Sequence, residues 1–163
     1  MPLGIQKVGL ISDTHGLLRE SAIEALGGSD LIVHAGDVGK PEILEALKKI
    51  APVVAVRGNV DTAVWARELP ETTVAEAGPV KIPVKIFVLH DLQALDLNPA
   101  VSGFRIVVSG HSHKPGQTTR DGVLYINPGS AGPRRFKLPV CLALLDLRPN
   151  PYAVEFVTLD GSP

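Results

Sequence analysis

Three short apolar runs near the N-terminus alternate with two helix-like stretches, and this alternation constrains the fold more than any other feature. The runs span residues 7–12, 30–35 and 52–57 and are rich in Val, Ile and Leu. Such runs are typical of strands buried on both faces of a parallel sheet. The helix-like stretches lie between them, at residues 17–28 and 40–50. Because parallel strands need crossover connections, this order predicts a β-α-β-α-β unit.

End signals support both helices. The first stretch closes on Gly27 and Gly28, which suit a helix C-terminus, and the second opens with Pro41 near its first turn.

The second half of the chain is rich in strands. Candidates separated by Gly, Pro, Asp and Asn turns occupy residues 72–77, 84–90, 105–110, 116–120, 122–130, 140–147 and 152–159. The Asp121-Gly122 pair predicts a hairpin turn, and one further helix is expected within residues 91–101. We therefore expect an α/β (α+β) fold with two sheets packed face to face and helices outside.

Composition sets the class of protein. The 163 residues are expected to form a single domain, residues 1–163, with an ordinary apolar content of 45%. A net charge of −1 offers no general attraction to nucleic acid or to anionic membranes. Cys141 lies in an apolar run and is expected to be a buried strand residue. The start of the chain does not resemble a signal peptide, and no apolar run approaches the roughly 18 residues of a membrane helix. These features predict a cytoplasmic protein.

Polar residues follow five of the predicted strands. Ligands of open α/β sheets bind outside the carboxyl ends of the strands, so these side chains are expected to share one edge. In chain order they are Asp13, His15, Asp37, Asn59, His90, His111 and His113.

Carboxylates mixed with imidazoles suit Mn, Fe, Ni or Zn better than Ca or Mg, which prefer oxygen ligands. Seven ligands are too many for one such ion and suit a pair that shares a carboxylate. Each residue also has a simpler interpretation. Asp13 could cap a helix, Asp37 and Asn59 could serve turns, and the "GHSH" histidines could be solvent-exposed. The joint pattern favours the metal site, whereas His34 lies inside a strand and is expected to pack or to support a ligand.

The ordered motifs D-x-H, G-D, G-N-x-D, a lone strand-end histidine and G-H-x-H resemble those of the calcineurin-like metallophosphoesterases. The segments "HAGD", "RGNVD", "GHSHKP" and "NPGS" are most similar to the small phosphodiesterases of the YfcE and MJ0936 type. The resemblance extends from Lys7 to about Leu159. It implies a four-layer αββα sandwich of two mixed sheets flanked by helices.

The resemblance also implies roles for individual residues. Asp13, His15 and His113 would hold the first ion, Asn59, His90 and His111 would hold the second, and Asp37 would bridge. Asp37, Asn59 and His111 are accordingly expected to act in catalysis. Two divalent transition-metal ions per chain are implied, Mn²⁺ first among them, with Ni²⁺, Zn²⁺ or Fe²⁺ as alternatives. The implied reaction is hydrolysis of a small or activated phosphodiester by in-line attack of a metal-bound hydroxide.

The chain departs from the family pattern at two places. Many relatives carry a histidine, a proposed general acid, where this chain has Val60. A His-Gly-His sequence is common where this chain has His90-Asp91-Leu92, so the pocket wall beside His90 is expected to differ from that of these relatives.

A second function remains open at this point. A non-catalytic interaction scaffold on the same fold, like the retromer subunit Vps29, is the alternative to a phosphodiesterase. The completeness of the seven ligand positions favours the enzyme. The expected partner is a small phosphoester substrate, with neither a nucleic-acid patch nor a membrane, and the oligomeric state is open.

Overall fold

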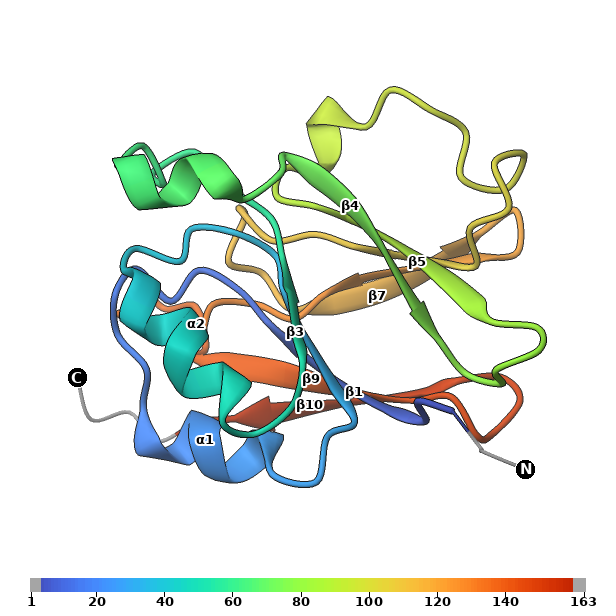
Figure 1. The fold of residues 1–163 in the computed structure, drawn as a ribbon, viewed down its shortest axis with the longest axis horizontal. Coiled ribbons are helices and arrows are strands. Elements are labelled where there is room, and N and C mark those ends of the chain that lie inside the picture. The colour runs from blue at the N-terminus through green and yellow to red at the C-terminus, as the bar shows by residue number, and fades with distance from the viewer. Residues whose placement is uncertain (1–3, 160–163) are drawn as a thin grey trace.

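The computed structural model describes residues 4–159. Two five-stranded sheets pack face to face, and the two α-helices lie together on the outer side of one of them (Figure 1). Both sheets combine parallel and antiparallel pairs, so the predicted sandwich of two mixed sheets is confirmed.

The first sheet has the strand order β10-β9-β1-β2-β3. Its strands are β1 (Lys7–Ile11), β2 (Leu31–His34), β3 (Val53–Ala55), β9 (Cys141–Asp146) and β10 (Ala153–Thr158). The N-terminal trio β1, β2 and β3 is parallel, and the helices α1 (Glu20–Leu26) and α2 (Pro41–Lys48) connect its members. The predicted β-α-β-α-β unit is therefore present.

The second sheet has the strand order β4-β5-β6-β8-β7. Its strands are β4 (Thr72–Ala77), β5 (Val84–Leu89), β6 (Ile106–Val108), β7 (Gly116–Arg120) and β8 (Val123–Asn127). The central strands β5, β6 and β8 are parallel, and each edge strand is antiparallel to its neighbour. The Asp121-Gly122 pair joins β7 to β8 with φ angles of 52° and 77°, as a two-residue hairpin turn requires.

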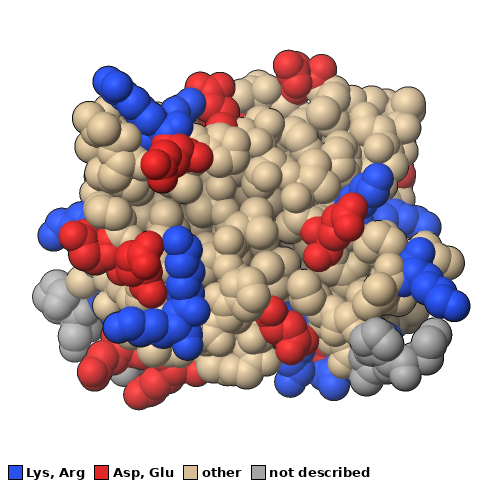
Figure 2. Space-filling view, viewed as in Figure 1, with Lys and Arg blue, Asp and Glu red and all other residues tan. Residues whose placement is uncertain are grey.

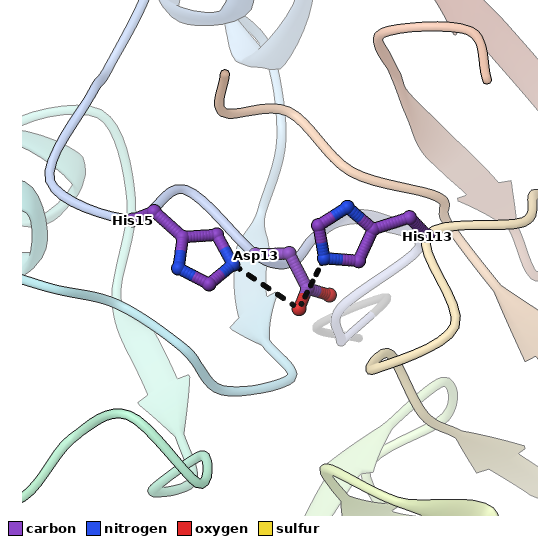
Figure 3. Close-up of side chains that lie close together, drawn as sticks. All are labelled: Asp13, His15 and His113. Carbon is purple, nitrogen blue, oxygen red and sulfur yellow. Dashed lines mark ion pairs between the residues drawn. The ribbon is translucent and has the colours of Figure 1, made fainter. Parts of the chain in front are cut away.

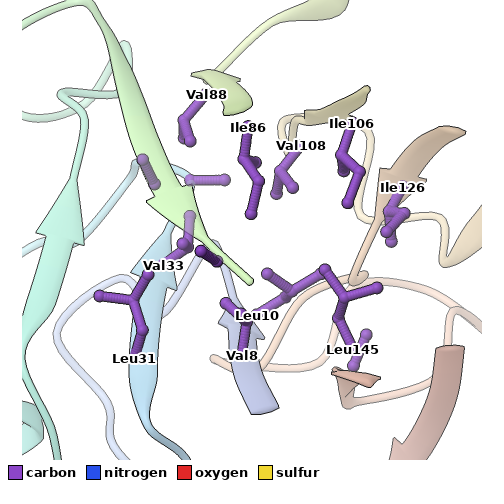
Figure 4. Close-up of a cluster of buried hydrophobic side chains, with 14 of the residues drawn as sticks. Val8, Leu10, Leu31, Val33, Ile86, Val88, Ile106, Val108, Ile126 and Leu145 are labelled. Atoms are coloured by element: carbon purple, nitrogen blue, oxygen red, sulfur yellow. The ribbon is translucent and has the colours of Figure 1, made fainter. Parts of the chain in front are cut away.

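The main core fills the space between the two sheets. Val8, Leu10 and Val33 of the first sheet face Ile86 and Ile106 of the second, and each is almost fully buried (Figure 4). Alternate residues of β1 and β2 point away from this core, toward the helices. This packing fixes the position of one sheet relative to the other. Strands of both sheets therefore have their carboxyl ends at the same end of the sandwich.

The outer faces are covered differently. Ile11 and Ile32 of the first sheet pack against Leu26 and Leu47 of the two helices. The outer face of the second sheet is covered by the connection between β5 and β6. The helix predicted within residues 91–101 is wrong except for one 3-10 turn, η2 (Leu92–Ala94). Asn98 and Pro99 follow closely and leave no room for a longer helix.

The ends of both helices agree with the end signals in the sequence. Pro41 is in the first turn of α2, and α1 ends at Gly27 followed by Gly28 with φ 84°. A second 3-10 helix, η1 (Val64–Glu68), lies between β3 and β4.

Charges of both signs are interspersed around the rim of the face in Figure 2. Among residues 4–159 no helix is long and apolar enough to cross a membrane.

Candidate metal centre

All seven residues singled out from the sequence meet at one end of the sandwich. β1 leads to Asp13 and His15, β2 to Asp37, β3 to Asn59, β5 to His90, and β6 to His111 and His113. Each sheet therefore contributes loops, and the side chains converge between them in two groups.

The Asp13 group consists of Asp13, His15 and His113. The Oδ1 atom of Asp13 lies 3.2 Å from Nε2 of His113 and 3.8 Å from Nε2 of His15 (Figure 3). Oδ1 of Asp13 and Nε2 of His15 are buried and have no hydrogen-bond partner among residues 4–159. Buried polar atoms are normally paired, so this arrangement fits a cation between the three side chains.

The Asp37 group consists of Asp37, Asn59, His90 and His111. Nε2 of His90 lies 3.2 Å from Oδ2 of Asp37 and 3.0 Å from Oδ1 of Asn59. Nδ1 of His111 is 3.2 Å from the same Asn59 oxygen. Four electron-rich atoms thus converge, which again fits a bound cation.

Asp37 is also the residue between the two groups. Its Oδ2 atom lies 3.7 Å from Nε2 of His15, in addition to its approach to His90. Its other oxygen, Oδ1, accepts a hydrogen bond from the Val60 backbone N–H at 3.0 Å. Asp13 is arranged in the same way, because its Oδ2 atom accepts from the Ser12 hydroxyl and the His111 N–H. In each carboxylate the protein holds one oxygen and leaves the other facing imidazoles.

Hydrogen bonds orient two of the histidines. Nδ1 of His90 donates to the carbonyl of Ala35 at 2.7 Å, which leaves a lone pair on Nε2 inside the Asp37 group. Nε2 of His111 lies 3.9 Å from Asp91, so Nδ1 faces the group. The departure from the family pattern at Asp91 therefore adds a carboxylate beside His111, and Leu92 packs near the outer face of the second sheet.

The loops of the centre carry backbone strain. Seven non-glycine residues among 4–159 have positive φ, and five of these are in the two groups: Asp13, His15, Asp37, His111 and His113. Positive φ is uncommon outside glycine and is concentrated at functional sites. The sequence indicated strand ends but not this strain, because the residue types alone do not specify it.

Electrostatics favour charged carboxylates. Burial raises the pKa of Asp13 and Asp37, but hydrogen bonds and the neighbouring histidines lower it more, so both pKa values lie below the ordinary range. Burial lowers the pKa of His90, yet Asp37 and the Ala35 carbonyl raise it overall. The centre therefore presents two anions at neutral pH, as divalent ligation requires.

Further residues support the centre, and sequence reasoning did not give them these roles. Both oxygens of buried Asp61 accept backbone N–H groups, from Val38, Gly39 and Gly58. Asp61 therefore ties two ligand loops together instead of facing a substrate. Asn127 donates to the Gly110 carbonyl and the Ser112 hydroxyl, and so holds the "GHSH" loop. The motifs G-N-x-D and "NPGS" contained both residues, but only tertiary contacts reveal what they bind.

As expected from its position inside a strand, His34 supports the ligand loops through hydrogen bonds. Its Nδ1 atom accepts from the Gly36 N–H, so Nε2 donates to the Thr14 hydroxyl, which donates to the Val38 carbonyl. Burial lowers the pKa of His34 to about 4, so the ring is neutral at neutral pH. Cys141 is likewise buried, and burial raises the pKa of its thiol to about 11.

We expect His34 to make stability depend on pH. Below an unfolded-state pKa of about 6.5, the unfolded chain binds a proton that native His34 refuses until about pH 4. The His34 contribution to the free energy of unfolding should therefore fall by about 3 kcal/mol across this window and not change below it. Urea unfolding in EDTA at several pH values, compared between wild type and His34→Gln, measures this difference. A constant difference across the window would contradict the assignment.

The centre opens to solvent on the Asp37 side. Asp13 and His113 are buried, whereas Asn59, Val60 and His111 are exposed at the mouth. A cavity of about 470 Å³ adjoins His111 and is also lined by Leu92, Lys114 and Tyr125. A substrate thus has access to the ligand cluster and space beside it.

Residues 7–150 match the Calcineurin-like phosphoesterase superfamily domain. The chain belongs to this superfamily. It is 35% identical over 136 residues to the probable metallophosphoesterase MJ0623 of Methanocaldococcus jannaschii, covering 78% of this chain and 69% of that protein. It is 30% identical over 162 residues to the phosphodiesterase YfcE of Escherichia coli, covering 87% of this chain and 88% of that protein.

Solved structures show the same fold. A novel archaeal phosphodiesterase superposes with a TM-score of 0.75 at 22% identity, over 93% of this chain and 99% of that one. Vps29 of Entamoeba histolytica, complexed with Zn²⁺, superposes with a TM-score of 0.67 at 23% identity, over 94% and 99%. These two likenesses concern the fold, which is shared by an enzyme and by a vacuolar sorting protein of the Vps29 type.

Proposed function

We propose that this protein is a dinuclear metal-dependent phosphodiesterase that hydrolyses small or activated phosphodiesters. The observation that carries the proposal is the convergence of seven side chains into two groups, with Oδ2 of Asp37 within 3.7 Å of a histidine of each group. Relatives that are named phosphodiesterase or metallophosphoesterase support a phosphoester substrate.

Each ligand has a role in this proposal. Asp13, His15 and His113 would hold one ion, Asn59, His90 and His111 would hold the other, and Asp37, whose Oδ2 atom approaches a histidine of each group, would contribute to both. When bound, the two ions would supply Lewis acidity, which would neutralise charge on the phosphoryl oxygens and lower the pKa of the attacking water. We also propose Mn²⁺ as the native metal and the cytoplasm as the location of the protein.

The chain's own residues position the reaction. The Val60 N–H donates to Oδ1 of Asp37, and the Ser12 hydroxyl donates to Oδ2 of Asp13. These hydrogen bonds restrict rotation of the two carboxylates, so the other oxygen of each keeps facing the histidines. A phosphodiester can approach the Asp37 group from solvent, because Asn59 and His111 are exposed. Water adds across the P–O ester bond there, forming a new P–O bond and releasing an alcohol that takes up the proton.

A scaffold of the Vps29 type remains the second candidate because it shares this fold. Metal binding does not separate the two functions, since a Vps29 structure contains Zn²⁺. Turnover does separate them. Protein loaded with Mn²⁺ should contain close to two ions per chain by elemental analysis and should hydrolyse an aryl phosphodiester. Two bound ions without turnover on any phosphoester would favour the scaffold.

The side chain of Val60 predicts which substrates react. It is 44% exposed beside Asn59 and cannot donate a proton to a leaving alcohol. Because general acid catalysis is typically worth about 10²–10⁴-fold, aryl diesters should react readily and alkyl monoesters slowly. Val60→His should raise kcat/KM for an alkyl monoester by about 10²-fold and change an aryl diester less.

The matched control is Val64→His, which adds a histidine at a position that is 73% exposed on η1. It should leave both rates near those of the wild type. A wild type that already prefers the alkyl monoester would refute the argument from Val60.

A further inference from the structure

Among residues 4–159, Phe136 is the one non-glycine residue with positive φ that neither the metal centre nor the hairpin explains. Seven non-glycine residues among 4–159 have positive φ; five are in the centre, Asp121 is in the β7–β8 turn, and the last is Phe136 at φ 52°. Its side chain is 94% exposed. A bulky residue at positive φ is an outlier, and exposure to water gives it no packing energy. Burial of the Phe136 side chain therefore does not offset the strain of this conformation.

The loop that carries Phe136 starts against the metal centre. Ser130 donates its hydroxyl to the Asp13 carbonyl at 3.1 Å, and the Ala131 N–H donates to the Ser12 carbonyl at 3.0 Å. Gly132 packs so closely that a Cβ there would overlap the Asp13 and Thr14 carbonyls. Residues 133–138, which we call the basic loop, therefore emerge directly beside the Asp13 group.

The basic loop is positively charged around its aromatic residue. Arg134, Arg135 and Lys137 flank Phe136, are exposed, and form no ion pair with a carboxylate among residues 4–159. Cations on both sides of an exposed ring are typical of surfaces that bind single-stranded nucleic acid, where phosphates contact the cations and a base stacks on the ring.

Space for a nucleoside also lies beyond His111. The 470 Å³ cavity there offers the apolar surfaces of Leu92 and Tyr125. The side chains of Gln93 and Gln117 line it and make no hydrogen bond to other described residues. Apolar faces with a few unpaired amides are suited to a flat heterocycle. The centre thus lies between a cavity on the His111 side and the basic loop on the His113 side.

We propose that the protein binds short single-stranded oligonucleotides across the metal centre, with a base on Phe136 and neighbouring phosphates on Arg134, Arg135 and Lys137. Cleavage of the bound strand rests on the proposed phosphodiesterase function, whereas binding does not. Hydrolysis adds water across one internucleotide P–O bond and leaves a phosphate on one product and a hydroxyl on the other. The net charge of −1 is compatible with this site because the cations are local to one loop.

Binding is tested with a fluorescein-labelled phosphorothioate oligothymidylate, which resists hydrolysis, and with Mn²⁺-loaded protein in an anisotropy titration. Phe136→Ala should weaken binding by about tenfold, while Phe136→Trp should keep it and Phe136→Leu should not, because stacking needs a ring. Arg134→Ala and Arg135→Ala should each lower the slope of log K against log salt by about 0.7. Ile82→Ala and Lys81→Ala, at exposed positions of the β4–β5 turn, are the matched controls and should bind as the wild type does.

Cleavage separates this proposal from the function on which it rests. The wild type should cleave thymidine 5′-(4-nitrophenyl phosphate) and oligothymidylate with a lower KM than methyl 4-nitrophenyl phosphate, and Phe136→Ala should raise KM for the oligonucleotide alone. Oligonucleotide binding without hydrolysis of any ester would overturn the enzyme and keep the binding site. Hydrolysis of the methyl ester with no oligonucleotide binding would overturn the binding site and keep the enzyme. Equal binding by Phe136→Ala and wild type would also overturn it.

Discussion

Replacing Asp37 with alanine should remove nearly all activity and disturb both metal ions. Its Oδ2 atom lies within 3.7 Å of a histidine of each group, so both groups lose a ligand atom together. We expect kcat/KM for an aryl diester to fall by more than about 10³-fold, since the ions and their electrostatic stabilisation are lost together. Elemental analysis after dialysis should find less than one ion per chain.

Asp96→Ala is the matched control, because Asp96 is an exposed aspartate on the connection between β5 and β6. It should keep two ions and full turnover. An Asp37→Ala protein that loses one ion and fully retains the other would show that Asp37 does not bridge.

Gly58→Ala should disable the centre although Gly58 carries no ligand. A Cβ at this position would overlap the backbone N and the Oδ1 atom of Asp37. Because the collision involves backbone, the Asp37 loop must move, and a displacement of about 1 Å in a catalytic group can cost about 10²-fold in rate. We expect at least this loss in kcat/KM, together with weaker metal binding in a titration followed by calorimetry.

Gly116→Ala provides the comparison, since no atom lies within 4 Å of a Cβ built there. It should retain the metal affinity of the wild type. Native metal affinity and turnover in Gly58→Ala would mean that the loop has more freedom than its contacts indicate.

Much of this fold could be predicted because its strands are buried in the interior. Continuous apolar runs strongly predict buried strands, and in β2 all four residues are buried. The predicted helix within residues 91–101 failed because Leu92, Leu95 and Leu97 pack onto the second sheet from an irregular segment. Apolar residues indicate that a segment is buried against its neighbours, but a short apolar stretch does not distinguish a helix from a loop that covers a sheet.

The candidate site was predictable in its members but not in its geometry. Strand ends identified the residues, since parallel strands bring their carboxyl ends to one edge. Which oxygen of Asp13 is held by Ser12 and which faces the histidines depends on a contact with the backbone of His111, on the other sheet. The structural role of Asp61 is similarly set by three N–H groups from two loops. Such pairings depend on tertiary distances that local sequence does not encode.

The contact between Asp13 and His111 also bears on the order in which the chain folds during synthesis. These residues are 98 positions apart, and residues 130–132 pack beneath the same loop. An emerging chain therefore exposes Asp13, His15 and Asp37 long before their partners exist. Contacts of such sequence separation form late, because loop closure must be complete before they contribute. Completion of the centre therefore requires both sheets, and a truncated chain that ends before β6 lacks His111 and His113, one residue of each group.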